Sequence, residues 1–399
     1  MDGEYETRPS AGNGGSSGTD SSDNGDALIQ MRDIYKIFKT AAGDYEALRC
    51  ISTEFYEGEF VGVVGRSGSG KSTLVNMLTG IDRPTSGEVL INGTRIHELS
   101  ESKMAIWRGR NLGIVFQFYQ LLPMLSLLEN VMLPMDLAEV YEPQEREERA
   151  MQLLGLVDLE KEAHNMPGAV SGGQQQSAAI ARALANDPPI IIADEPTGNL
   201  DSRSAELVFQ IFEMLVEQGK TIVMVTHDNS LAQRASRTLL LSDGEVINET
   251  IAATLPLLSH SQMLTATKNQ EPMQFQPGEM IIRQGENIDY FYMITRGHIE
   301  IILTGPGGSK VRVARLGPGQ FFGEVELLRS GKSIAGIRAG QESTVEVIAL
   351  NREVFKQLMY EAETQRESLI RVVHERLAEN QAMKKTLKRS PLSRWRSKE

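Results

Sequence analysis

Residues 60–78 read FVGVVGRSGSGKSTLVNML and decide the fold of the first half of the chain. The apolar run 60–64 predicts a buried strand, the glycine-rich segment a tight loop, and the following stretch a helix. Residues 65–72 fit G-x-x-x-x-G-K-[ST], in which backbone N–H groups and a helix N-terminus surround phosphate groups. Lys71 is expected to reach the β- and γ-phosphates of a nucleotide, and Ser72 to bind Mg²⁺. The residues predicted to hold the nucleotide are Gly65, Arg66, Ser67, Gly68, Ser69, Gly70, Lys71, Ser72 and Thr73.

A second apolar run, Ile190-Ile191-Ile192-Ala193, ends in the acidic pair Asp194-Glu195. Two carboxylates at the end of a buried strand are costly unless a cation or a catalytic role accounts for them. Asp194 suits indirect Mg²⁺ binding, and Glu195 suits a general base that polarises an attacking water. We therefore predict a nucleotide-hydrolysis site.

Strand-like and helical stretches alternate through this region. Short β-rich runs cover residues 59–64, 112–116, 190–193 and 221–226, with helical patterns between them. Such alternation is typical of a parallel α/β sheet with helices on its faces. The first domain is thus predicted to be an α/β P-loop NTPase.

The segment Val170-Ser171-Gly172-Gly173-Gln174-Gln175-Gln176 resembles the signature loop of the ATP-binding cassette (ABC) ATPases. The resemblance covers about residues 28–250. It implies ATP hydrolysis, a helical subdomain, and a head-to-tail homodimer. Ser171, Gly172 and Gly173 of one copy would then contact the ATP held by the phosphate loop of the other copy.

The same resemblance implies roles for four further residues. Gln117 would sense Mg²⁺ as a ligand and transmit motion to a permease, while Asp201 belongs to a loop that crosses the dimer interface. His227 would act as the γ-phosphate switch, and Phe38 would stack on adenine. Taken singly, such a Gln, His or Phe is more often structural. One departure is Ser177, which stands where the family usually has an Arg.

Three stretches narrow the resemblance: residues 116–123 (FQFYQLLP), 128–134 (LENVMLP) and 194–201 (DEPTGNLD). Together they resemble the ATPases of lipoprotein release, macrolide export and bacterial cell division. The implied partner is a separate integral-membrane permease, which the ATPase drives in export or mechanotransmission. The implied location is the cytoplasm, peripheral to the inner face of the cell membrane.

The composition of the chain argues against several kinds of binding site and structural feature. The formal charge is −12, from 41 basic and 53 acidic residues, which gives no reason to expect nucleic-acid binding. Cys50 is the only cysteine, so an intramolecular disulfide and a cysteine-cluster metal site are excluded. No apolar run approaches the ~20 residues that span a bilayer. The tail 384–399 is basic and contains Trp395, so contact with an anionic membrane is possible, although a solvated tail is slightly favoured.

The pattern of predicted secondary structure changes after about residue 273. Short β-rich runs at 290–294, 298–303, 311–316 and 344–350 are separated by glycine-containing turns, which predicts a small β-barrel or jelly roll. A trailing helix is expected at about 352–383. Hydrophobic residues recur there at helical spacing.

This second region resembles a cyclic-nucleotide-binding domain over about residues 258–375. Phe322, Gly323 and Glu324 match the opening of that family's phosphate-binding segment, in which Glu324 would bind the ribose 2′-hydroxyl. Ser333 stands where the family has the Arg that pairs with the cyclic phosphate, and Glu326 stands where a small residue is usual. We predict weak or absent cyclic-nucleotide binding, because a charge-assisted contact is missing. A scaffold or dimerisation module, or a different small ligand, are the alternatives.

Two other readings of the whole chain remain open from the sequence. The protein could be an ATP-dependent regulatory scaffold for cell-envelope or cell-division machinery, with the C-terminal domain as an interaction module. A DNA-repair ATPase is a weaker option, against which the net negative charge argues.

We divide the chain into an acidic, disordered tail (1–26), the ATPase domain (27–250), a helical connector (251–270), the barrel domain (258–375, overlapping the connector), and the helix end with its basic tail (376–399).

Overall fold

The computed structural model describes residues 27–41, 43–198, 200–227, 234–304, 310–329 and 332–389, with side chains up to residue 378. The predicted acidic tail 1–26 and the last ten residues of the basic tail lie outside the described residues, as does Asn199 of the predicted interface loop. In the described part, no helix is both long enough and apolar enough to cross a membrane.

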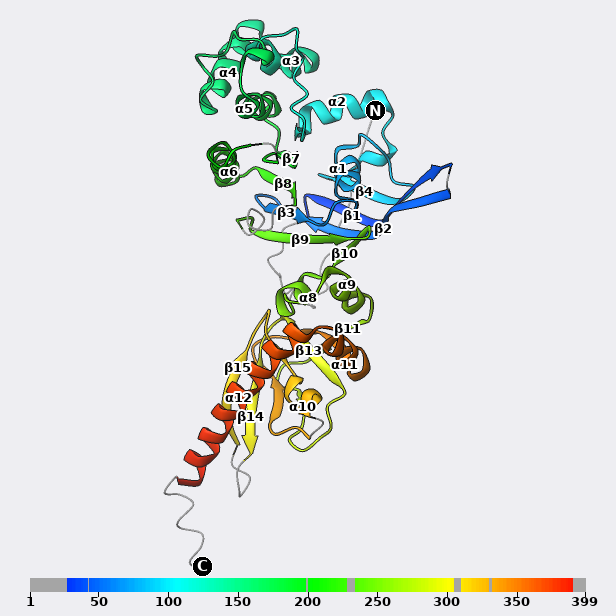
Figure 1. Cartoon of the computed structure of the whole chain (residues 1–399), viewed down its shortest axis with the longest axis vertical. Helices are drawn as coiled ribbons and strands as arrows, with labels where there is room; N and C mark the ends of the chain where they lie inside the picture. Colours follow the sequence, from blue (N-terminus) through cyan, green and yellow to red (C-terminus); the bar gives the residue numbers. More distant parts are fainter. Residues whose placement is uncertain are drawn as a thin grey trace, which may run out of the picture.

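The predicted parallel sheet forms the centre of the first unit (Figure 1). Six of the described strands form one sheet in the order β10-β9-β3-β8-β7-β6. The pairs that β3 forms with β8 and β9, and β7 with β6 and β8, are parallel, whereas β10 and β9 are antiparallel. The β3 and β8 strands are buried throughout, which explains their continuous Val, Ile and Met runs. The strand bounds are β3 Phe60–Val64, β6 Leu112–Val115, β7 Ile190–Asp194, β8 Thr221–Thr226, β9 Arg237–Ser242 and β10 Glu245–Ile247.

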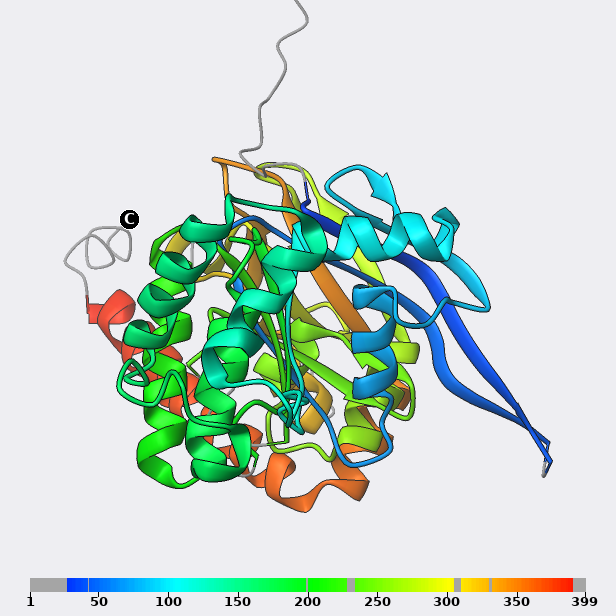
Figure 2. The same cartoon turned by 90° about the horizontal axis from the view of Figure 1, so that it is seen from above.

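Helices and a second sheet surround this centre. The described residues before 96 also form an antiparallel sheet in the order β2-β1-β4-β5, and its β1–β2 hairpin extends away from the body (Figure 2). The helices α3, α4 and α5 pack on one another as a separate helical subdomain. The bounds are β1 Ile29–Thr40, β2 Gly43–Phe55, β4 Ser86–Ile91, β5 Thr94–Arg95, η1 Ile96–Glu98, η2 Pro167–Ala169, α1 Lys71–Thr79, α2 Glu101–Asn111, α3 Leu127–Ala138, α4 Pro143–Leu156, α5 Gly172–Ala183 and α6 Ser202–Glu217.

The second unit is a barrel of two antiparallel sheets. Strands described between residues 270 and 351 form the orders β11-β18-β13-β16 and β12-β17-β14-β15. The predicted single trailing helix is instead two helices, α11 and α12, which break at Ala362. The long helix α12 lies along the barrel (Figure 1). The bounds are β11 Gln270–Phe275, β12 Met280–Ile282, β13 Tyr290–Arg296, β14 Ile299–Thr304, β15 Lys310–Leu316, β16 Phe321–Phe322, β17 Gly336–Ala339, β18 Val345–Asn351, α10 Glu324–Arg329, α11 Arg352–Glu361 and α12 Glu363–Arg389.

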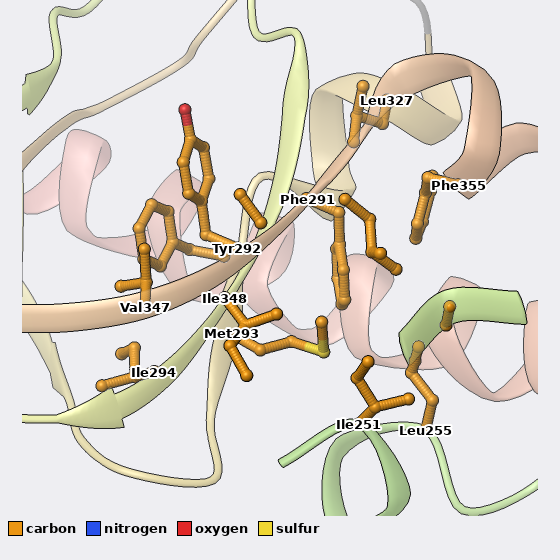
Figure 3. Packing of buried hydrophobic residues seen from close by; sticks show 14 of the residues in the cluster. Ile251, Leu255, Phe291, Tyr292, Met293, Ile294, Leu327, Val347, Ile348 and Phe355 are labelled. Atoms are coloured by element: carbon orange, nitrogen blue, oxygen red, sulfur yellow. The ribbon is translucent and has the colours of Figure 1, made fainter. Parts of the chain in front are cut away.

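The connector is part of the barrel's core. Two helices, α8 (Glu249–Thr254) and α9 (His260–Lys268), lie between the ATPase sheet and the barrel (Figure 1). Ile251 of α8 and Leu255, the residue after that helix, point toward Met293 of β13, close to Phe291 (Figure 3). The same buried cluster includes Ile247 of β10, so one apolar core runs from the edge of the ATPase sheet into the barrel.

Candidate functional site

The phosphate loop connects β3 to α1 with the geometry that the motif requires. Gly70 precedes α1 at φ +103°, a conformation that glycine adopts readily. A Cβ on Gly70 would lie 2.6 Å from the Ala47 carbonyl oxygen, and a Cβ on Gly65 would collide with the Leu241 carbonyl oxygen. The loop thus has no room for side chains at either glycine, and the backbone itself lines the concave turn.

Lys71 is buried at the start of α1. Its Nζ donates to the carbonyl oxygens of Gly65 (2.8 Å) and Arg66 (3.1 Å). The ammonium group thus lies inside the loop that is expected to surround the phosphates. The pKa of His260 on α9 is lowered, mainly by partial burial and further by the positive charge of the nearby Arg66. Arg66 of the phosphate loop therefore lies near α9 of the connector.

Asp194 and Ser72 meet at the end of β7. Burial raises the pKa of Asp194, and the neighbouring Glu195 raises it further, whereas the hydrogen bond from Ser72 and the charge of Lys71 lower it. A buried carboxylate beside a hydroxyl is the kind of oxygen pair that Mg²⁺ prefers. These two residues fit the ion predicted from the sequence.

The structure brings Gln117, Glu195 and His227 together. Gln117 follows β6, Glu195 follows β7 and His227 follows β8, so all three lie at the carboxyl edge of the sheet beside the phosphate loop after β3. Gln117 Nε2 donates to Glu195 Oε2 at 3.1 Å, and His227 Nδ1 lies 3.3 Å from the same oxygen. Ligands of α/β sheets bind at this edge.

Glu195 has an uncommon backbone conformation. Its φ of +46° is in the left-handed region, which costs a non-glycine residue about 1–3 kcal/mol. Backbone hydrogen bonds from Glu195 N to Val225 O (2.9 Å) and from Gly198 N to Glu195 O (3.2 Å) hold the turn. The turn takes the backbone out of the strand direction directly after β7, which leaves Glu195 at the sheet edge.

Phe38 lies on β1 and is 36% exposed. Lys36 Nζ is 4.9 Å from the centre of its ring. The ring is accessible, as an adenine-stacking residue must be.

The signature residues begin α5 and lie away from the phosphate loop of the same chain. Ser171 caps α5 through a reciprocal capping box with Gln174. The space beside Gly172 is taken by the Tyr119 hydroxyl and that beside Gly173 by Ser204. Both Figures 1 and 2 show α5 well separated from α1.

Asp201 caps α6 and accepts from the N–H groups of Arg203 and Ser204. Ser177, the departure from the family pattern, is buried in α5. Beside it, neither amide atom of the buried Gln176 has a hydrogen-bond partner among the described residues.

Two residues that the sequence analysis missed hold the segment after Gln117. Arg182 of α5 donates to the carbonyl oxygens of Gln120 (2.6 Å) and Tyr119 (2.9 Å). Asn130 of α3 is fully buried, accepts from Leu122 N (2.7 Å) and donates to carbonyl oxygens of the same segment. Their partners are backbone groups, so the sequence does not reveal these contacts, although Asn130 lies in the stretch 128–134 that narrowed the resemblance.

Comparison with known proteins agrees with this geometry. The sequence model for "ABC transporter" matches residues 48–198. An ABC transporter ATP-binding protein of Thermotoga maritima is 47% identical over 219 residues, which are 55% of this chain and 93% of that protein.

The chain belongs to the ABC transporter ATP-binding proteins. This ABC ATPase is also 42% identical over 262 residues to the macrolide export ATP-binding/permease protein MacB of Syntrophobacter fumaroxidans, which covers 65% of this chain and 35% of that protein. Its fold matches the ATP-binding cassette MJ0796, solved as a dimer in a post-hydrolysis state with ADP and Pi. The TM-score is 0.54 at 41% identity, over 55% of this chain and 97% of that chain. The prediction of an ABC ATPase is confirmed.

The second unit of this ABC ATPase matches the model for "Cyclic nucleotide-binding domain" over residues 272–361, which confirms the predicted domain type. Its barrel holds a cavity of about 510 Å³, lined by Phe322, Gly323, Glu324, Glu326 and Ser333 among others. The structure therefore brings the four predicted ligand-site residues to one cavity.

The polar groups of this cavity are mostly engaged with one another. Glu324 is 1% exposed, and its Oε1 accepts from Arg376 of α12 at 2.6 Å. Burial raises the pKa of Glu324 although Arg376 lowers it, and burial also raises the pKa of Glu326. The Ser333 hydroxyl donates to the Ala335 carbonyl oxygen at 2.6 Å. Among the described residues that line the cavity, Arg376 is the one cation, and it is paired with Glu324.

Proposed function

We propose that two copies of this ABC ATPase bind two ATP molecules at their shared interface and use hydrolysis to drive a separate membrane permease. The observation that carries the proposal is the convergence of Gln117, Glu195 and His227 at the carboxyl edge of the sheet, next to the phosphate loop. That arrangement supplies a base and two polar groups at the place where a γ-phosphate would lie.

Glu195 is the proposed general base. It takes a proton from the water that attacks the γ-phosphorus, while the bond to the leaving ADP oxygen breaks. Gln117 and His227 orient its carboxylate, and His227 also contacts the γ-phosphate. Ser72, Asp194 and Gln117 would hold Mg²⁺, which would neutralise negative charge on the nucleotide phosphates.

The remaining nucleotide contacts follow from the loop and the aromatic ring. Residues 65–73 surround the phosphates with backbone N–H groups, and Lys71 turns from the loop carbonyls toward them. Phe38 stacks on adenine. Each role is a proposal for the residue named.

A second copy would complete the site. The signature residues 171–173 lie away from the phosphate loop of their own chain, so they are free to contact ATP held by a partner. Asp201, at the start of α6, would lie at the same interface. The dimeric state of the relative MJ0796 supports this arrangement.

Exposed apolar side chains support a permease as the partner. Phe118 is 69% and Met124 is 71% exposed, and both belong to the segment that begins at Gln117. Exposed apolar side chains in the same short segment favour a contact with another protein. Because Arg182 and Asn130 fix the same segment, movement of Gln117 would be transmitted to it. This partner would place the ATPase on the cytoplasmic face of the membrane.

The Glu195→Gln variant tests the proposal. The amide keeps the shape and loses the base, so we expect ATP turnover to fall by about 10²–10⁴-fold while ATP binding and ATP-dependent dimerisation persist. Glu217→Gln, on the exposed end of α6, is the matched control and should turn over ATP normally. Affinity purification of Glu195→Gln with ATP from native membranes should recover a permease. Full turnover by Glu195→Gln refutes the assigned base, and recovery of soluble partners alone refutes the permease.

A further inference from the structure

The residues that line the cavity in the barrel differ in polarity and charge from those of an anion-binding site. Its volume of about 510 Å³ is that of a pocket for a small molecule, and most of the lining side chains are apolar. The polar exceptions are two buried carboxylates, a guanidinium and a hydroxyl, from Glu324, Glu326, Arg376 and Ser333.

The donors in this wall are already used. Arg376 Nη1 donates to Glu324 Oε1 (2.6 Å) and to the Phe321 carbonyl oxygen (2.9 Å), and its guanidinium lies 4.8 Å from the centre of the Phe321 ring. The Ser333 hydroxyl donates to a backbone carbonyl. Among the described lining residues, Arg376 is the one cationic side chain, so an anionic ligand would have to break its existing pair.

An acceptor, in contrast, is unused. Glu324 Oε2 has no hydrogen-bond partner among the described residues although the side chain is 1% exposed. Glu326 lies close enough to influence Glu324 electrostatically, and it accepts from Ile334 N at 3.2 Å. Above the raised pKa values of the two carboxylates, where both are ionised, the wall with a charged Arg376 carries a net charge of −1. A buried acceptor of this kind is satisfied by a ligand that brings a donor.

We propose that this cavity binds a small apolar molecule that carries an amino group, with the ammonium nitrogen donating to Glu324 Oε2 beside Glu326 and the apolar body lying against the aliphatic wall. Anionic cyclic nucleotides are rejected, because their phosphate would face two carboxylates without a free cation. The charge of the ligand balances the excess negative charge of the wall. Protonation of either carboxylate removes that attraction, so binding weakens as the pH falls through their raised pKa values.

The test compares ligands that share a skeleton and differ in charge. Tryptamine, tryptophol and indoleacetate form one series, and phenethylamine, phenethyl alcohol and phenylacetate form another, with cyclic AMP and cyclic GMP as anionic references. Each is titrated into the full chain, and binding is read by calorimetry and by the rise in melting temperature. This readout does not involve ATP turnover, so it can fail while the proposed ATPase function stands, and the reverse.

We expect at least one amine to bind, to bind about tenfold or more tightly than its alcohol, and to bind far more tightly than its carboxylate. Glu326→Gln, which keeps an acceptor for Ile334 N, should abolish most of the preference for the amine. Glu324→Gln should do the same, and Glu367→Gln on the exposed face of α12 is the control. The proposal is overturned if neither amine binds, if the alcohols bind as well as the amines, if a carboxylate or cyclic nucleotide binds as well or better, or if Glu326→Gln leaves the preference unchanged.

Discussion

Replacing Arg376 with Met removes a charge from the barrel while keeping much of the aliphatic stem. In the wild-type protein, Arg376 pairs at 2.6 Å with Glu324, whose side chain is 1% exposed. Removing one partner of a buried ion pair costs about 3–5 kcal/mol, because the other charge stays buried without compensation. The Arg376 side chain is 21% exposed, so solvent reaches part of the pair and we expect the lower end, about 3 kcal/mol.

The loss should depend on pH in a defined direction. The folded-state pKa of Glu324 is already raised by burial, so stability associated with it is greatest at low pH and is lost as pH rises through the folded pKa. Arg376 lowers that pKa, so Arg376→Met raises it further. The deficit relative to wild type should therefore be small in acid, where Glu324 is protonated in both proteins, and full near neutral pH.

The assay is thermal unfolding of the full chain across this pH range. A loss of about 3 kcal/mol corresponds to roughly 6–12 °C for a unit of 150–250 residues. Adding Glu324→Gln to Arg376→Met removes the buried charge, and the double variant should recover part of the loss. A double variant that is less stable than Arg376→Met alone, or a deficit that does not change with pH, would refute the reasoning.

Three further changes have defined outcomes. Gly65→Ala has no space for its methyl group, so ATP affinity measured with a fluorescent nucleotide should fall by at least about tenfold, and unchanged affinity would contradict the loop geometry. Arg182→Met removes both carbonyl contacts and keeps the aliphatic stem, so ATP turnover should fall several-fold with ATP affinity retained; equal loss of both would argue against a role in positioning. Ser333→Arg combined with Glu326→Ala supplies a cation and removes an acid, so calorimetry should detect cyclic AMP binding that wild type lacks; absence of binding would place the obstacle elsewhere in the barrel.

The sequence was sufficient to predict that Gln117, Glu195 and His227 lie together, because each of them closely follows a buried strand. Once Gln117, Glu195 and His227 are placed after parallel strands, the shared carboxyl edge of the sheet brings them together. The motif positions therefore predict spatial neighbours without knowledge of the loops.

The supports of that site could not be predicted in the same way. Arg182 acts on the carbonyl oxygens of Tyr119 and Gln120, which are more than sixty residues away in sequence. Any donor at the correct position on α5 could serve, so side-chain identity alone carries little information. The left-handed backbone of Glu195 also depends on contacts with a neighbouring strand.

In the barrel, the sequence predicted the loss of the phosphate-binding Arg but not the pairing of Glu324 with Arg376. Arg376 comes from α12, 52 residues after the glutamate that it pairs with. The break at Ala362, which the helical periodicity did not reveal, lets α12 turn back along the barrel. A long-range pair of this kind depends on how the last helix docks.

The apolar core that joins β10, α8 and the barrel has a consequence for how this protein can be divided. Ile247, Ile251 and Leu255 belong to the same buried cluster as Phe291 and Phe355. A cut anywhere in the connector would therefore divide this cluster and expose apolar side chains on both the ATPase fragment and the barrel fragment. The barrel is thus not a removable accessory. Heating should melt it together with the edge of the ATPase sheet, and a gene that lost the barrel would need compensating polar substitutions on β10 and α8 to keep its ATPase soluble.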